Sequence, residues 1–188
     1  MIRFEELQMR IMDAAKNYLE VFDMATLVEQ YSLNKESKLS MTLSEIKPPY
    51  PISATVSFSY DVHQTSSSVF LDEELEDEFD NAVEIDVIIN IPHIDGYNDI
   101  AELFEEINAE YGDLEPVLVK KEFYRKDLIE AEEYEISYSY IIGGEELRDL
   151  QFFEEMFFEL SNILRLIYEK MKFFLDMTWY REREDDIF

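Results

Sequence analysis

Residues 52–62 read Ile-Ser-Ala-Thr-Val-Ser-Phe-Ser-Tyr-Asp-Val, and this stretch decides the fold class. Apolar and polar side chains alternate along it without a break, and a period of two is typical of a β-strand with one buried face. The other face would be wet and rich in hydroxyl groups. Because strands with one solvated face occur mainly in antiparallel sheets, the stretch predicts an antiparallel sheet.

Further strands are expected on the C-terminal side of this stretch. Residues 83–91 are apolar at every second position and also at Ile88, which predicts a central strand. Residues 116–124 and 134–142 predict two more. Residues 65–71 are expected to form a turn and a short strand, and the carboxylate-rich run 72–80 a mobile loop.

Helical spacing predicts three helices around these strands. Residues 2–29 have apolar side chains at three- and four-residue steps and predict one long N-terminal helix. Asn98 or Asp99 can cap a short helix that ends at Gly112 in the left-handed conformation. The stretch 145–180 predicts a long C-terminal helix.

These elements give an α+β fold in the order α-βββ-α-ββ-α, with an antiparallel sheet of about five strands and helices on one face. The chain is expected to form a single domain, 1–188. Its parts would be an N-terminal helix (1–29), a polar, proline-rich linker (30–51), a sheet with one inserted helix (52–142) and the C-terminal helix (145–180).

Composition limits the function. The formal net charge is −28 on 188 residues, while 47% of the residues are apolar and 14% aromatic, so the acid is expected on the surface of a folded protein. Such a surface repels nucleic acids and anionic membranes. There is no cysteine, no secretory signal at the start and no membrane span, so a cytoplasmic location is expected.

Candidate chemical sites are few. His93 with Asp95 could form an acid–base or metal pair, but one histidine and one carboxylate are too little for a zinc site. The run 95–99 lacks the ligand spacing of a calcium loop, and Gly143-Gly144 is followed by acid where a phosphate loop needs a lysine. We therefore expect no enzyme activity, no cofactor and no metal.

The apolar surface of the C-terminal helix is wider than one sheet can cover. Its excess is expected to pack against the helix 2–29 or against a second copy, and a homodimer is predicted. A second surface is the serine-rich face of 52–62 and the serine/tyrosine face of 134–142. Either could take an extended peptide by strand addition if it lay at a sheet edge. The candidate partner-binding residues are Phe152, Phe157, Phe158, Phe173, Phe174, Tyr138 and Tyr140.

The order of the elements in this small acidic chain resembles the type III secretion chaperone-like fold. The resemblance covers most of residues 1–180 and rests on element order and acidity. The stretch 30–51 and the length of the last helix depart from it. It implies a homodimer that binds an extended, non-globular segment of a client without ATP.

Two functions follow as hypotheses. The first is a non-enzymatic acidic protein-binding module, chaperone- or adaptor-like, that engages its partner through apolar helix and sheet surface. The alternative is an inhibitor or immunity-type protein that masks a basic nucleic-acid enzyme, with carboxylates where phosphates would lie. The runs 72–80 and 182–186 motivate this alternative.

Overall fold

The computed structural model describes residues 4–28, 34–61, 83–94, 96–125, 128–143, 147 and 149–180. The helical elements are α1 (Phe4–Tyr18), α2 (Ile100–Tyr111), the 3-10 turn η2 (Gly112–Leu114), α3 (Leu150–Phe174) and the π-helical turn η4 (Leu175–Trp179). The strands are β1 (Glu20–Val28), β2 (Asn34–Thr42), β3 (Ser53–Asp61), β4 (Val83–Pro92), β5 (Val117–Arg125) and β6 (Leu128–Ile142).

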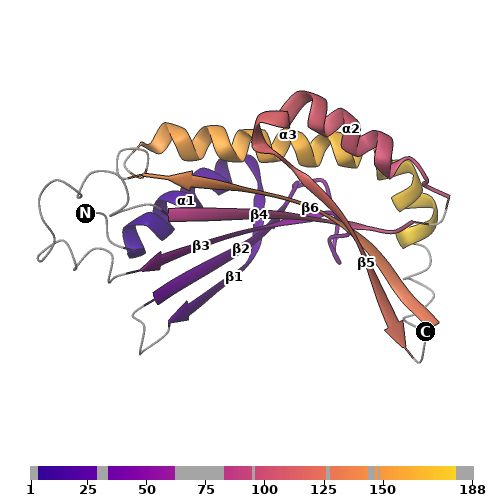
Figure 1. The fold of residues 1–188 in the computed structure, drawn as a ribbon, viewed down its shortest axis with the longest axis horizontal. Helices are drawn as coiled ribbons and strands as arrows, with labels where there is room; N and C mark the ends of the chain where they lie inside the picture. The colour runs from indigo at the N-terminus through magenta and orange to yellow at the C-terminus, as the bar shows by residue number, and fades with distance from the viewer. Residues whose placement is uncertain are drawn as a thin grey trace, which may run out of the picture.

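The strands form one antiparallel sheet in the order β1-β2-β3-β4-β6-β5. The described residues thus contribute six strands, where the sequence predicted about five. The first four follow one another along the chain, α2 then leads to β5 at the far edge, and β6 returns between β5 and β4. The three helices lie over one face of this sheet (Figure 1). The predicted α+β class, the helices on one face and the long C-terminal helix are confirmed.

The core lies between that face and the helices. Alternate residues of β3 and β4 are buried, such as Val56 and Val87, which are opposite each other in the sheet. Phe157 and Leu160 of α3 are fully buried, and Phe4 of α1 has its ring 5.8 Å from that of Phe58. The helices therefore cover the apolar half of a sheet whose strands alternate as predicted.

The predicted helix 2–29 and the predicted linker 30–51 are wrong. α1 ends at Tyr18, after which residues 20–28 form β1 and residues 34–42 form β2. β1 is an edge strand with apolar side chains exposed, so its sequence lacks the alternation of a half-buried strand and was read with a helical period. β2 does alternate, with Leu39 and Met41 buried, but polar residues dominate it.

Three boundaries also differ from the prediction. The strand predicted at 134–142 already begins at Leu128. Gly112 has right-handed φ (−61°), and the left-handed residue is Glu115 with φ of 49°. α3 begins at Leu150 because the carboxylate of Asp149 accepts a hydrogen bond from the Gln151 backbone N–H (2.9 Å), which caps the helix there. The predictions for 65–71 and 72–80 fall outside the described residues.

Candidate functional site

The sheet face opposite the helices is the most distinctive surface of the molecule, and we call it the open face. In the part of the chain that the structure describes, no helix lies on this face (Figure 1). On β3 it carries the polar half of the alternating stretch, with Ser53, Thr55 and Ser57 half-buried and Ser59 exposed. The face is therefore wet but partly sheltered.

Strand register joins the two predicted serine faces into one. Ser57 of β3 is opposite Asp86 of β4, and Asp86 is opposite Ser139 of β6. In the next row, Thr55 and Ser137 have an apolar residue of β4 between them. The sequence predicted each face separately, and the sheet order places both on one surface because β4 lies between β3 and β6.

The tyrosines of 134–142 do not share this surface. Tyr138 and Tyr140 are opposite Val87 and Ile85, which are buried under the helices. The serine/tyrosine stretch is thus two faces, with tyrosines toward the core and serines toward the open side. Neither β3 nor most of β6 is at a sheet edge, so the condition for strand addition on those faces is not met there.

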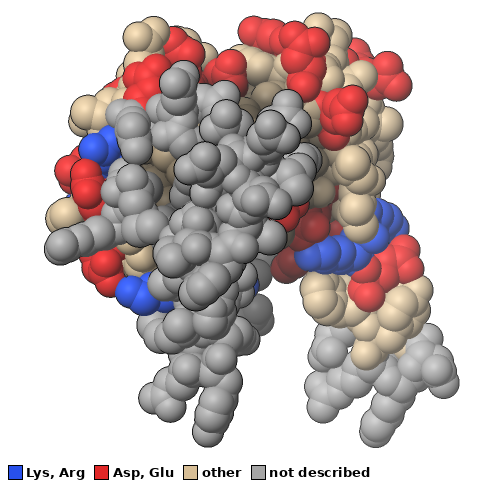
Figure 2. All heavy atoms as spheres, turned by 60° about the vertical axis from the view of Figure 1, so that its left-hand side comes forward, with Lys and Arg blue, Asp and Glu red and all other residues tan. Residues whose placement is uncertain are grey.

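A hollow of about 470 Å³ lies on the open face. It forms where β5 begins, since Val117 is opposite Ser137 and the rest of β6 beyond Ser137 has no β5 residue beside it. The η2 turn and Glu115 stand at this place and form one wall. On the face drawn in Figure 2, basic groups and carboxylates lie next to each other on the right-hand part of the molecule. The polar lining residues of the hollow are Ser57, Asp86, Asp113, Glu115, Glu135, Ser137 and Ser139.

The carboxylates around the hollow are unevenly neutralised. Glu135 forms an ion pair with Lys121. Among the described residues, Asp86, Asp113 and Glu115 have no ion-pair partner. The hollow therefore has an excess of negative charge, and concave surfaces concentrate the field of such groups.

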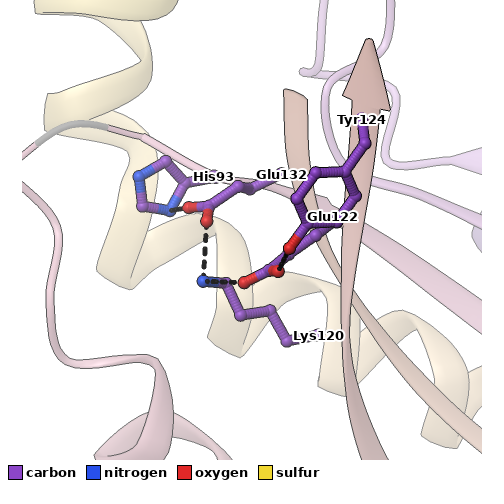
Figure 3. A network of polar contacts seen from close by, with 5 residues as sticks. All are labelled: His93, Lys120, Glu122, Tyr124 and Glu132. Atoms are coloured by element: carbon purple, nitrogen blue, oxygen red, sulfur yellow. Dashed lines mark hydrogen bonds and ion pairs between the residues drawn. The ribbon is translucent and has the colours of Figure 1, made fainter. Parts of the chain in front are cut away.

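A polar network joins the hairpin of β5 and β6 to His93 (Figure 3). Strand register places Glu122 and Glu132 on the same face as the buried Ile136, opposite the open face. Lys120 Nζ donates to Glu132 at 2.7 Å and to Glu122 at 3.0 Å, and the Tyr124 hydroxyl donates to Glu122. His93 Nδ1 is 3.5 Å from the second oxygen of Glu132. The network ties the end of β4 to the hairpin.

The network keeps its charged groups charged. Hydrogen bonds that Lys120 donates to the carboxylates of Glu132 and Glu122 raise the pKa of Lys120 well above its usual range. Hydrogen bonds from Tyr124 and Lys120 lower the pKa of Glu122, and the bond to Glu122 raises the pKa of the Tyr124 phenol. A lysine held as an ammonium ion cannot act as a nucleophile or base, so the arrangement suits a structural role.

The predicted His93–Asp95 pair is not tested, because Asp95 lies outside the described residues. His93 instead has Glu132 as a neighbour, a carboxylate 39 positions along the chain that no local spacing could reveal. Among the described residues there is no group of three or more histidine, aspartate and glutamate side chains that could hold a metal ion.

The predicted partner-binding residues divide into three groups. Phe157 and Tyr138 are buried in the core, so in this structure they are packing residues, and their role in partner binding stays a prediction. Phe152, Tyr140 and Phe174 are partly buried against the core. Phe158 and Phe173 are exposed, with 52% and 65% of their surface accessible, and their role in binding stays a prediction.

Asp86, Asp113 and Glu115 were missed as candidates. Asp86 could have been found, since it occupies one of the polar positions that alternate with the apolar residues of β4. Asp113 and Glu115 are brought to it only by the path of the chain around the end of β5.

The chain was compared with protein-family models, curated proteins and solved structures. No family model, no curated protein and no solved structure matches the chain. A search of the described helices for one long and apolar enough to cross a membrane finds none.

Proposed function

We propose that this protein is a non-enzymatic, acidic binding module that holds a basic, extended segment of a partner protein on the open face of its sheet. One observation carries the proposal: the helices occupy one face, and the opposite face has a hollow with three carboxylates that lack ion pairs within the described residues. Lysine and arginine side chains are the groups that such a surface recognises.

The serine rows support an extended ligand. Ser57, Ser137 and Ser139 offer hydroxyl groups that donate and accept, so they can bind both N–H and C=O groups of a peptide backbone. The hollow has a volume within the usual range for ligand sites, which is roughly 300–1,000 Å³. A chaperone- or adaptor-like role agrees with this mode of binding.

The test uses an extended lysine–serine repeat peptide as the probe and follows backbone amide resonances of the protein. We expect shifts at Ser57, Ser137 and Ser139, and none along α3. The variant Asp86→Asn should weaken binding roughly five-fold, because a unit charge near a cation is removed. The matched control is Glu105→Gln, which makes the same charge change at an exposed position of α2 and should leave binding unchanged.

Two results would contradict the proposal. Shifts confined to α3 around Phe158 and Phe173 would place the binding surface on the helix instead. Equal weakening by Asp86→Asn and Glu105→Gln would mean that only net charge matters.

The alternative function is an inhibitor that masks a basic nucleic-acid enzyme. The same three carboxylates favour it, because they could occupy the place of backbone phosphates in such an enzyme. Inhibition of a basic nuclease that is lost with Asp86→Asn and with added salt would support it. A basic nuclease that stays fully active at saturating concentrations of this protein would contradict the inhibitor hypothesis.

A further inference from the structure

We propose that the outer edge of β1 pairs antiparallel with β1 of a second copy, around a two-fold axis at Ala25. The inference is independent of the open face and concerns how the molecule associates with itself. Among the described strands, β1 is a terminal one and has β2 as its single neighbour. An edge strand presents a row of N–H and C=O groups that can pair with another strand.

The two edge strands of the sheet differ in the charged residues that oppose pairing with a strand of another chain. β5, the opposite edge, has Lys120, Lys121 and Glu122 at its centre, and charged side chains, lysine above all, are the usual guard against strand pairing. β1 has nine residues with only two charges, Glu20 and Asp23, and neither lysine nor proline. β1 is therefore the edge that is open to pairing.

Apolar side chains on β1 are exposed in the single chain. Met24 and Leu27 have 50% and 56% of their surface accessible, and Phe22 has 39%. The ring of Phe22 stacks on Tyr50, with the ring centres 4.4 Å apart, which fixes one end of the strand. Apolar groups along an unpaired edge gain most from burial against a second strand.

The register follows from symmetry and from the bulge. The pairing of β1 with β2 shifts between Val21 and Asp23, so the regular part of β1 runs over residues 23–28. A two-fold axis perpendicular to the sheet keeps both helical layers on one side, and opposite residues then share a face. An axis at Ala25 uses 23–27 of each copy and places the smallest side chain of the strand at the axis.

This register separates the acidic groups. Asp23 of one copy would be opposite Leu27 of the other, and Met24 would be opposite Thr26, so no two carboxylates meet. The choice of a second copy as the occupant rests on this self-complementary pattern. The two sheets would join into one, with both open faces on the same side.

Salt should act on this contact in the opposite sense to its action on a basic ligand. Each copy carries a formal charge of −28, so the copies repel each other over a distance, and salt screens that repulsion. Dimerisation is therefore expected to strengthen as salt rises, whereas peptide binding at the open face weakens. A failure of one proposal can thus be told from a failure of the other.

The experiment measures the mass of the full chain by sedimentation equilibrium at low and high salt. We expect a dimer that tightens with salt. Ala25→Lys places like charges opposite each other at the axis and should weaken the dimer about ten-fold or more. The matched control is Val119→Lys on β5, an exposed position with the same charge change, which should leave the dimer intact.

A single cysteine tests the geometry, because the chain has none of its own. Ala25→Cys should form a disulfide-linked dimer on mild oxidation, since opposite Cα atoms in an antiparallel pair lie about 4.5–5.5 Å apart. Phe158→Cys and Val119→Cys should not. A chain that is monomeric at every salt concentration, a dimer unchanged by Ala25→Lys, or faster cross-linking through Phe158→Cys would each overturn the proposal.

Discussion

At the scale of single residues, Tyr138 and Tyr140 of β6 differ in whether the hydroxyl group has a hydrogen-bond partner. The Tyr140 hydroxyl donates to Glu159 of α3 at 3.2 Å. The Tyr138 hydroxyl is buried and, within the described residues, meets no hydrogen-bond partner. A buried polar group without a partner costs free energy, because it loses water and gains nothing in return.

Removal of the Tyr138 hydroxyl is therefore expected to stabilise the protein. Tyr138→Phe should raise the free energy of unfolding by about 1 kcal/mol, as measured by urea denaturation. The control is Tyr140→Phe, which deletes a hydroxyl that has a partner and should be neutral or destabilising. A loss of stability in Tyr138→Phe would show that its hydroxyl is satisfied after all.

The same tyrosines predict how stability depends on alkaline pH. Burial raises the pKa of Tyr138 far above the usual 10.0, with Tyr140 and Glu159 adding to the effect, and burial with the Glu159 charge also raises the pKa of Tyr140. Above pH 10 the unfolded chain therefore loses protons that the folded chain keeps. Stability is fully present below pH 10 and is lost as pH rises further toward the folded-state pKa values.

Phenolate absorbance checks this expectation. The exposed tyrosines should titrate first, and those of β6 should ionise only together with loss of the circular dichroism of the fold. Tyr140→Phe should make stability less steeply dependent on pH in this range. Ionisation of every tyrosine before unfolding would contradict the assignment.

At the scale of elements, two adjacent phenylalanines of α3 differ in burial. Phe157 is fully buried, whereas Phe158 is 52% exposed and has its ring 5.7 Å from that of Tyr18. Neighbours in a helix are about 100° apart, so one faces the sheet and the other faces away. A wide apolar helix is thus part core and part surface.

Alanine substitution should distinguish the two positions. Phe157→Ala leaves a cavity in the core and should cost roughly 3–5 kcal/mol of unfolding free energy. Phe158→Ala loses one exposed aromatic contact and should cost less than about 1 kcal/mol. Similar values for both, from chemical denaturation, would mean that α3 does not pack on the face described.

At the scale of the whole molecule, charge dominates the behaviour. Lysine and arginine balance only 16 of the 44 carboxylates, which leaves the formal net charge of −28. Carboxylates that repel one another destabilise the compact state, and salt screens this repulsion.

Salt is therefore expected to stabilise the fold. The melting temperature should rise between low salt and roughly physiological ionic strength, where the screening length falls to about 8 Å. Sodium chloride and potassium chloride at equal ionic strength should act alike, because the effect is one of screening. A melting temperature that falls with salt would show that attractive ion pairs outweigh the repulsion.

Element identity followed the sequence where one face was buried and apolar, whereas β2 alternates but is dominated by polar residues and was missed. β3 and β4 alternate because each has one face on the core, and α3 keeps a helical period because one side of it is buried. β1 was not predicted, because the side chains of this edge strand are mostly exposed and its sequence does not alternate between apolar and polar residues. Only part of the candidate site could be predicted. The sequence indicates that Ser57 and Ser139 are solvent-facing, but it does not indicate that they lie on one surface.

The sequence by itself determined the fold class, the long C-terminal helix and the acidic surface, because these depend on local periodicity and composition. Tertiary structure alone decided that two serine faces become one surface and that Asp113 and Glu115 stand beside Asp86. It also decided which aromatic residues are core. Strand order and the path of the chain bring distant residues together, and no local spacing records either of them.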